Sequence, residues 1–316
     1  MCAESVRSKF LGALVGTGVG DALGAGFEGL APFDLRTIEA VVGEREVLRY
    51  TDDTHMMIGV AESLVAKGGF DGEHMAEVFA RNYEAEPWRG YGPGPPLIFR
   101  MLRLGGYWDR VGDKVYHGGS YGNGSAMRVA PVGVLYHDDP DSLREVAYMS
   151  SQITHSHELG KEGAALQAYA VALALSMRCD SNFDAEEFLS RLANFVRHTV
   201  YRERLAKAKR LLNTGEAAVI VDELGHGVEA FNSVPTAIYC FASHAGSFKD
   251  AVLFAVGLGG DTDTIAAMTG AISGAYLGLE GVPEGWRFRL EKRPYIEELA
   301  GKLYEVWLKK RELSAS

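Results

Sequence analysis

The sequence predicts an all-α fold, a single compact orthogonal multi-helix domain that spans residues 1–316. Apolar residues recur at helical three- and four-residue spacing along most of the chain, and no series of alternating strands and helices appears. No Pro- or Ser-rich linker, charge block or low-complexity segment divides the chain. These observations favour one helical domain over a string of smaller units.

Two rows of small residues predict helices whose backbones closely approach other backbones. Each row has a four-residue spacing, with Gly12, Gly16, Gly20 and Gly24 in one and Ala266, Gly270, Gly274 and Gly278 in the other. A glycine inside a helix costs about 1 kcal/mol relative to alanine. So many glycines on one face therefore indicate tight helix packing, which would hold the ends of these helices rigidly.

The remaining elements follow from apolar stripes and from residues that start or stop helices. A stripe from Met56 to Val65 is stopped by Gly68-Gly69, and Asp71 is placed to cap the next helix. Residues 163–177 are apolar almost all round, as in a helix at the centre of a domain. Further helices are expected over residues 185–200, 202–212 and 296–308, with short strands as an option at Val41-Val42 and residues 46–50, and loops over residues 90–96 and 118–124.

The charge balance excludes two classes of partner. The chain carries 32 Lys and Arg against 42 Asp and Glu, a formal net charge of -10. Such a surface repels phosphate backbones and anionic lipid, so nucleic acid and membrane surfaces are not expected partners. The three cysteines include no CxxC pair, and no export signal opens the chain. A soluble cytoplasmic protein is expected.

Two acidic clusters are the strongest chemical signal. They are Thr51-Asp52-Asp53-Thr54 and Asp261-Thr262-Asp263-Thr264, and each stands just before a long apolar helix. Helix capping needs one Asp or Thr and does not explain two carboxylates within three residues at both places. Buried neighbouring carboxylates need neutralisation, and two divalent cations would supply it. The oxygen ligands favour Mg²⁺, Mn²⁺ or Ca²⁺ over zinc, so the clusters predict a binuclear metal cleft.

Other candidate residues lie in less specific patterns. Glu28 follows the first glycine-rich helix and is compatible with a site acid or base, although an exposed Glu is the alternative. Gly90 and the loop 118–124 lie in glycine-rich stretches with aromatic residues, where a binding loop and a simple connection are both open. His155 in His155-Ser-His157 is favoured as a ligand-contacting or hydrogen-bonding histidine over a metal ligand.

Four motifs in order carry a specific resemblance, which runs from Phe10 to about Trp286. They are residues 16–24 with Glu28, Tyr50–Thr54, Gly119–Arg128 and Gly259–Thr264. This set resembles the ADP-ribosylglycohydrolase family, and the resemblance implies an all-α enzyme that binds two Mg²⁺ ions. Residues 119–124, Thr154-His155 and residues 233–241 are most similar to the branch called ADP-ribosylhydrolase type three.

The branch resemblance implies a substrate class. It implies a hydrolase that removes serine-linked ADP-ribose and hydrolyses O-acetyl-ADP-ribose, free or attached to protein. Arginine-directed branches usually carry a different loop at residues 120–124. Two alternatives stay open, namely an arginine-linked, N-glycosidic ADP-ribose hydrolase and a non-catalytic ADP-ribose-binding or structural member.

The resemblance also implies roles for individual residues. Thr51, Asp52 and Asp53 would hold one side of the metal pair, and Asp261, Asp263 and Thr264 the other, with Asp263 as the bridge. Glu28 would contact a metal and act in catalysis, with Mn²⁺ as an alternative to Mg²⁺. The substrate-binding set would be Gly90, Gly118, Gly119, Ser120, Tyr121, Gly122, Asn123, Gly124, His155 and Val228.

Within that set, residues 118–124 would wrap the diphosphate with their backbone N–H groups. A positive φ is an option for Gly122. Val228 would touch the adenine, and Tyr121 would stack on or pack beside the substrate. The aromatic residue expected just before the loop falls on Val115, or on Tyr116 after a shift of one residue.

Overall fold

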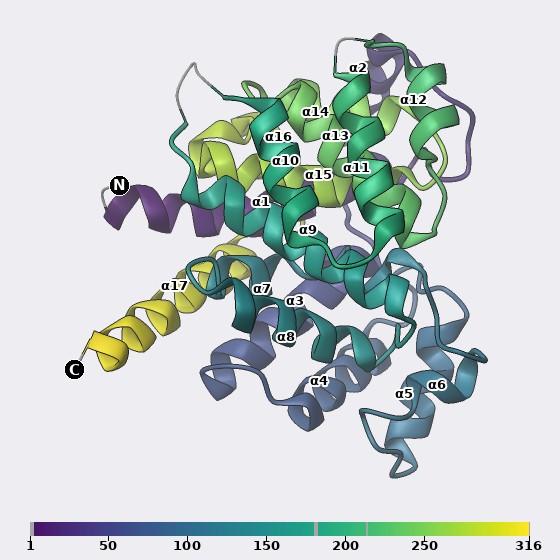
Figure 1. The fold of residues 1–316 in the computed structure, drawn as a ribbon. Helices are drawn as coiled ribbons and strands as arrows, with labels where there is room; N and C mark the ends of the chain where they lie inside the picture. Colours follow the sequence, from purple (N-terminus) through teal and green to yellow (C-terminus); the bar gives the residue numbers. More distant parts are fainter. Residues whose placement is uncertain (1–2, 180–182, 213, 316) are drawn as a thin grey trace.

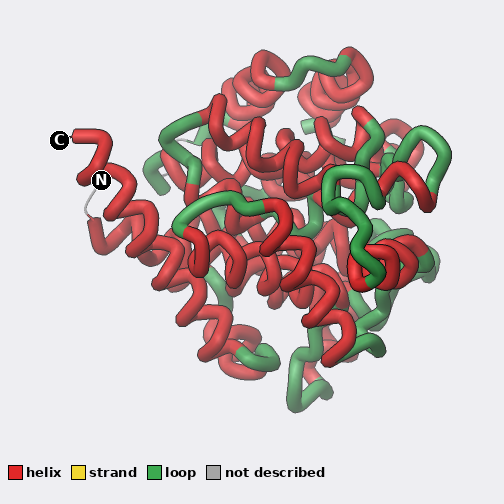
Figure 2. The backbone as a smooth tube through the Cα atoms, turned by 90° about the horizontal axis from the view of Figure 1, so that it is seen from below, coloured by secondary structure: helices red, strands yellow, loops and turns green. Residues whose placement is uncertain are grey.

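The architecture is helical throughout, as the sequence predicts. The computed structural model describes residues 3–179, 183–212 and 214–315. Within these ranges the chain forms α-helices and two short 3₁₀ helices, η1 (Asn123–Ser125) and η2 (Leu279–Gly281), and the only ladder contacts are two isolated β-bridges (Figure 2).

The helices follow one another with loops of varied length (Figure 1). The first eight are α1 (Ala3–Gly24), α2 (Leu35–Gly43), α3 (Asp52–Lys67), α4 (Gly72–Ala85), α5 (Gly94–Arg103), α6 (Gly112–Val115), α7 (Ala130–Leu135) and α8 (Pro140–Gln152). The other nine are α9 (Glu158–Ser176), α10 (Ala185–Phe195), α11 (Thr199–Leu211), α12 (Ala217–Leu224), α13 (Ala230–Ser243), α14 (Phe248–Gly257), α15 (Thr262–Leu277), α16 (Glu284–Arg289) and α17 (Arg293–Ala315).

Helices α1 and α15 pack backbone to backbone at the centre of the fold (Figure 1). The two rows of small residues face each other, because a Cβ atom on Gly16 would lie 2.3 Å from the Gly270 carbonyl oxygen. A Cβ atom on Gly20 would lie 2.0 Å from the Ala266 carbonyl oxygen. The tight packing predicted for these rows is confirmed, and it places the end of α1 beside the start of α15.

Helix α9 is buried on almost every side, as its apolar sequence predicts. It packs against α8, α7, α13 and α15, so it supports the central pair from one side. The hydrophobic core is continuous from Val6 on α1 to Trp307 on α17. Within the described residues, no helix is both long and apolar enough to span a membrane.

The short strands suggested at Val41-Val42 and at residues 46–50 are wrong. Val41 and Val42 belong to α2, which Asp34 caps and which buries Ile38 and Val42, four residues apart, on one face. This face packs against α14, and tertiary packing overrides the β-propensity of the valines. Residues 46–50 are extended but pair only through one bridge, between Leu48 and Leu290.

The helix expected over residues 185–200 is interrupted. α10 ends at Phe195, and α11 starts at Thr199 after His198, whose Nδ1 accepts a hydrogen bond from the Val200 N–H. The buried Glu162 carboxylate of α9 accepts hydrogen bonds from the backbone N–H groups of Arg197 and His198. These contacts form between segments distant in sequence, so periodicity does not reveal the break.

Candidate metal centre and ligand cleft

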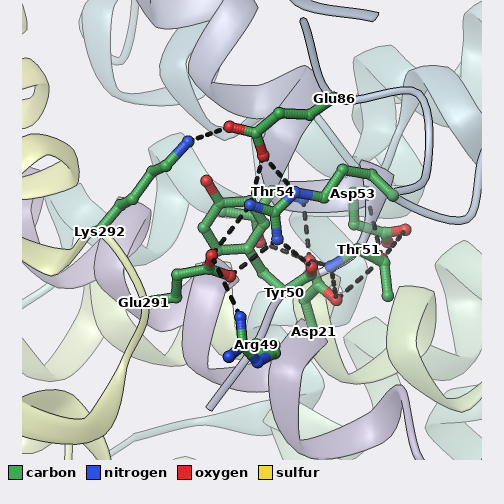
Figure 3. A network of polar contacts seen from close by, with 10 residues as sticks. Asp21, Arg49, Tyr50, Thr51, Asp53, Thr54, Glu86, Glu291 and Lys292 are labelled. Carbon is green, nitrogen blue, oxygen red and sulfur yellow. Dashed lines mark hydrogen bonds and ion pairs between the residues drawn. The ribbon is translucent and has the colours of Figure 1, made fainter. Parts of the chain in front are cut away.

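The first acidic cluster is held in place by Asp21, which lies in the interior of α1 and is fully buried. Its carboxylate accepts hydrogen bonds from the N–H groups of Thr51 and Thr54, each at 3.0 Å (Figure 3). The hydroxyls of the same two threonines donate to it at 2.9 and 2.5 Å. Asp21 therefore fixes the first turn of α3, from which Asp52 and Asp53 project.

Helix capping explains little of this acidic cluster. Thr51 is the N-cap of α3, and its side chain accepts a hydrogen bond from the Asp53 N–H. Asp52 and Asp53 make no cap bond, and the Asp53 Oδ1 atom is buried without a hydrogen-bond partner among the described residues. An unpartnered buried carboxylate oxygen is costly unless a ligand or cation satisfies it.

The second acidic cluster starts α15. Asp261 occupies the N-cap position without making a side-chain cap bond. Its Oδ2 atom instead accepts a 2.6 Å hydrogen bond from the Asn123 side-chain amide, and its N–H donates to the His226 carbonyl at 2.9 Å. The glycine-rich loop and the acidic cluster are therefore joined directly, which the sequence did not predict.

Glu28 lies in the loop that follows α1. This loop is pinned to the start of α15, because the Gly29 N–H donates to the Gly260 carbonyl and the Gly260 N–H donates to the Leu30 carbonyl. Oxygens of Glu28, Asp261 and Asp263 lie within 4.8 Å of one another. Three carboxylates from two segments therefore offer oxygens at a spacing that suits a metal ion.

The acidic clusters and the glycine loop line one cleft with a cavity of about 280 Å³. Of the predicted site residues, the lining includes Glu28, Thr51, Asp52, Asp53, Gly90, Ser120, Gly122, Asn123, Gly124, His155, Val228, Asp261, Asp263 and Thr264. Segments more than two hundred residues apart thus meet at one site. Gly118, Gly119 and Tyr121 are not among the lining residues.

Burial raises the pKa values of the clustered carboxyl groups. Burial raises the pKa of Asp21 to about 6, and burial together with the charge of Asp21 raises that of Asp52 to about 7. Burial and the charge of Asp263 raise the pKa of Asp53 well above its ordinary range. Burial and the charge of Asp261 do the same to the pKa of Asp263. Partial burial and the charge of Asp261 raise the pKa of Glu28.

These residues fit a hard divalent cation. The donor set consists of carboxylate and threonine oxygens, with an orphaned oxygen on Asp53 and mutual repulsion among the acids. Hard cations such as Mg²⁺ and Mn²⁺ prefer these ligands and would relieve the repulsion. The geometry therefore supports a cation site between the starts of α3 and α15.

The raised pKa values predict how pH and Mg²⁺ affect stability. Between pH 4 and 7 the folded protein binds protons on Asp21 and Asp52 that the unfolded chain, with an Asp pKa of 3.8, has lost. These groups therefore lower the free energy of unfolding as pH rises, and Mg²⁺ would offset that loss. We expect Mg²⁺ to raise the melting temperature more at pH 7.5 than at pH 5.5. Equal increases at both pH values, measured by calorimetry, would contradict this coupling.

The glycine-rich loop is anchored to the segment before α13. The Asn123 N–H donates to the Val228 carbonyl at 2.9 Å, and the Ala230 N–H donates to the Tyr121 carbonyl at 3.0 Å. Gly118 and Gly119 have positive φ values of 81° and 84°. The positive φ suggested for Gly122 is wrong, since its φ is -63°.

The His155 ring lies against the glycine-rich loop and leaves no room for a side chain at position 124. A Cβ atom on Gly124 would lie 2.7 Å from His155 Cε1, and one on Gly122 would lie 3.4 Å from His155 Nε2. The His155 Nδ1 atom pairs with the Thr154 hydroxyl at 2.8 Å. Burial, with the nearby Arg128 charge, lowers the pKa of His155 to about 3, so the ring is neutral. The loop therefore rests directly on a neutral imidazole.

A variant at Gly124 tests this arrangement. Gly124→Val pushes the loop off the His155 ring, because the added side chain overlaps ring atoms that burial prevents from moving. We expect at least a tenfold increase in the Kd for ADP-ribose, with the Kd for Mg²⁺ changed less than threefold. Gly246→Val is a suitable control, since a Cβ atom there meets no neighbouring atom within 4 Å. Unchanged ADP-ribose affinity in calorimetry would remove the loop from the binding site.

Several placements refine the sequence prediction. Tyr116 lines the cleft and Val115 does not, so the aromatic residue occupies the shifted position. Tyr121 is 48% exposed and packs against His157 and Phe231 rather than into the cleft. His157 caps α9.

Some cleft residues were not predicted from the sequence. Thr154 and the fully buried Arg128 line the cleft, and Asp21 supports it. For Asp21, the available signal was a carboxylate in the part of α1 after Lys9, which is otherwise uncharged. Arg128 offered no comparable signal, because its burial depends on packing over the Phe79 ring.

The helical fold and the carboxylate-lined cleft define a helical protein with a ligand cleft beside a candidate cation site. Residues 3–312 match the family model described as ADP-ribosylglycohydrolase. The chain therefore belongs to the ADP-ribosylglycohydrolase family of hydrolases.

Individual relatives agree with this assignment. The ADP-ribosylhydrolase ARH3 of Bos taurus is 37% identical, over 96% of this chain and 94% of the relative. The ADP-ribosylarginine hydrolase Tri1 of Pseudomonas putida is 26% identical, over 96% of this chain and 79% of the relative. A solved structure titled ADP-ribosylglycohydrolase-related protein complex is similar at a TM-score of 0.74 and 28% identity, covering 96% of this chain and 99% of that one.

Proposed function

We propose that this protein is a Mg²⁺-dependent hydrolase that cleaves the O-linked bond at the distal ribose of ADP-ribosyl substrates. Serine-linked ADP-ribose and O-acetyl-ADP-ribose are the expected substrates. The observation that best supports this proposal is that Glu28, the two acidic clusters and the glycine-rich loop line one cleft. Residues 1–316 would act as one domain, in line with the continuous core.

The metal ligands would come from both sides of the cleft. Thr51, Asp52 and Asp53 would hold one ion, Asp261 and Thr264 the other, and Asp263 would contact both. Two bound Mg²⁺ ions would supply Lewis-acid stabilisation of the vicinal ribose hydroxyls and of a nearby water. Asp21 and Asn123 would orient these carboxylates through the hydrogen bonds described above.

The chain's own groups would then bind and cleave the substrate. Residues 118–124 would wrap the diphosphate with backbone N–H groups other than those of Gly119, Gly122 and Asn123, which donate to Tyr116, Ser120 and Val228. Tyr116, His155 and Val228 would contact the substrate. Positive charge develops at the anomeric carbon as the C–O bond breaks, and the carboxylates around it would stabilise that charge. Glu28, whose pKa is raised by burial and by Asp261, would move the proton.

The arginine-linked alternative shares the metal site but requires a different leaving-group pocket. The higher identity to ADP-ribosylhydrolase ARH3 than to the ADP-ribosylarginine hydrolase supports the O-linked proposal. Parallel assays on serine-linked and arginine-linked ADP-ribosyl peptides and on O-acetyl-ADP-ribose test it. We expect ADP-ribose release from the serine-linked peptide and O-acetyl-ADP-ribose only, and release solely from the arginine-linked peptide would overturn the proposal.

A further inference from the structure

Gly90 lines the cleft beside Asp52 and lies between Arg89 and Tyr91, which do not line it. Gly90 has a φ of 92°. A Cβ atom on Gly90 would lie 3.7 Å from Asp52 Oδ1 and 3.9 Å from Thr51 Cβ. Glycine adopts this positive φ without strain, so the residues on either side of Gly90 decide where its backbone lies beside Asp52.

Arg89 holds the segment on one side. Its Nη1 atom donates to the Tyr50 carbonyl at 3.0 Å and to Glu291 Oε2 at 2.7 Å, and Nη2 donates to Glu291 Oε1 at 3.0 Å. Its Nε atom donates to Glu86 at 2.6 Å, and its guanidinium lies 4.2 Å from the centre of the Tyr50 ring. Arg89 is only 8% exposed, so this arrangement is a buried, fully paired clamp.

The clamp extends to the C-terminal part of the chain. Glu291 is tied to residue 48 through its N–H, which donates to the Leu48 carbonyl at 3.0 Å. Lys292 pairs with Glu86 and has a positive φ of 52°, uncommon for a residue other than glycine (Figure 3). Figure 3 shows Glu86, Glu291 and Tyr50 gathered beside Thr51 and Asp21. The acid cluster and the clamp are therefore continuous.

Tyr91 holds the segment on the other side. Its hydroxyl pairs with the Nδ1 atom of His55 at 2.8 Å, and His55 stacks on the Tyr50 ring. Arg89 thus contacts Tyr50 and Tyr91 contacts His55, the two residues that flank the Thr51–Thr54 turn. Gly90, between Arg89 and Tyr91, is held beside Asp52 by these contacts.

We propose that Arg89 and Tyr91 are positioning residues for the metal centre, acting through Tyr50, His55 and Gly90 on the Asp52 carboxylate. This inference rests on the proposed metal-dependent function. A substitution that keeps the positive charge but breaks the clamp should therefore weaken Mg²⁺ binding without removing any metal ligand.

Arg89→Lys is the decisive variant, because a lysine ammonium cannot reproduce the forked contacts to Tyr50, Glu86 and Glu291. We expect its Kd for Mg²⁺, measured by calorimetry with the metal alone, to rise about 10–100-fold, the usual effect of losing a group that orients metal ligands. Saturating Mg²⁺ should restore most of the kcat. Glu291→Gln, which keeps Arg89 and removes one charge, should shift the Kd in the same direction and covers the case in which Arg89→Lys does not fold.

Arg144→Lys provides a matched control for simple loss of stability. Arg144 is also 8% exposed, pairs with Glu162 and a backbone carbonyl, and lies over an aromatic ring, but it does not line the cleft. We expect it to lower the melting temperature while the Kd for Mg²⁺ stays within twofold of the unsubstituted protein.

The outcomes separate this inference from the proposed function. Unchanged Mg²⁺ affinity in Arg89→Lys, or an equal loss in Arg144→Lys, would overturn the positioning role and leave the metal site intact. If the unsubstituted protein bound no Mg²⁺, both the proposed metal site and the positioning role of Arg89 would be refuted.

Discussion

Removal of divalent cations should abolish turnover of O-linked ADP-ribosyl substrates and lower the melting temperature of the protein. A cation that binds only the folded state stabilises it by about 2.7 kcal/mol at a free concentration one hundred times its Kd. For a chain of this size we expect a shift of several degrees on treatment with a chelator. Full turnover in excess chelator would refute the metal-dependent mechanism.

Asp263→Asn should separate activity from stability at this site. The charges of Asp261, Asp21 and Glu28 all add to the burial that raises the pKa of Asp263, so a neutral amide of the same size relieves repulsion in the metal-free protein. We expect the metal-free variant to melt at or above the temperature of the metal-free parent, to lose its response to Mg²⁺ and to show no turnover. Asp71→Asn, at the N-cap of α4 away from the cleft, is the control and should keep full Mg²⁺ response and turnover.

Glu28→Gln should lower kcat by about 10²–10⁴-fold, the range expected for loss of a positioned acid or base. ADP-ribose should still bind with a Kd within a few fold of the parent, since the glycine loop and the two aspartate clusters remain. The measurements are kcat on O-acetyl-ADP-ribose and calorimetric Kd for ADP-ribose, both at saturating Mg²⁺.

Glu46→Gln is the matched control for Glu28→Gln. Glu46 is exposed and outside the cleft, and its replacement should leave both quantities unchanged. If Glu28→Gln also kept near-parental turnover, the proton transfer would have to be assigned to one of the aspartates.

The helical fold was predictable because its signals are local. The stripe before Gly68, the apolar run of α9 and the glycine rows of α1 and α15 all report helix geometry within a few residues. That the two glycine rows face each other was not predictable, because a small-residue row indicates close approach without naming the partner. The strand suggested at Val41-Val42 failed because burial of α2 against α14 decides that segment.

The candidate site likewise combines residues that local sequence patterns predict with residues that they do not. Both acidic clusters could be predicted because each has two carboxylates within three residues, just before a long apolar stretch. Asp21, Arg89 and the bond from Asn123 to Asp261 were not predictable, since each acts on a segment 30 or more residues away. A positive φ was suggested for Gly122, whereas its φ is -63° and the glycine that the His155 ring requires is Gly124.

A crystal structure of the protein with Mn²⁺ and ADP-ribose, with anomalous diffraction recorded for manganese, would show whether metal ions and substrate share the cleft. We expect two anomalous peaks between the oxygens of residues 51–53 and those of residues 261–264. We also expect the distal ribose beside these peaks and the diphosphate against the glycine-rich loop. ADP-ribose bound in the cleft without manganese at the aspartates, or bound elsewhere on the molecule, would rule out a metal-dependent hydrolase site in this cleft.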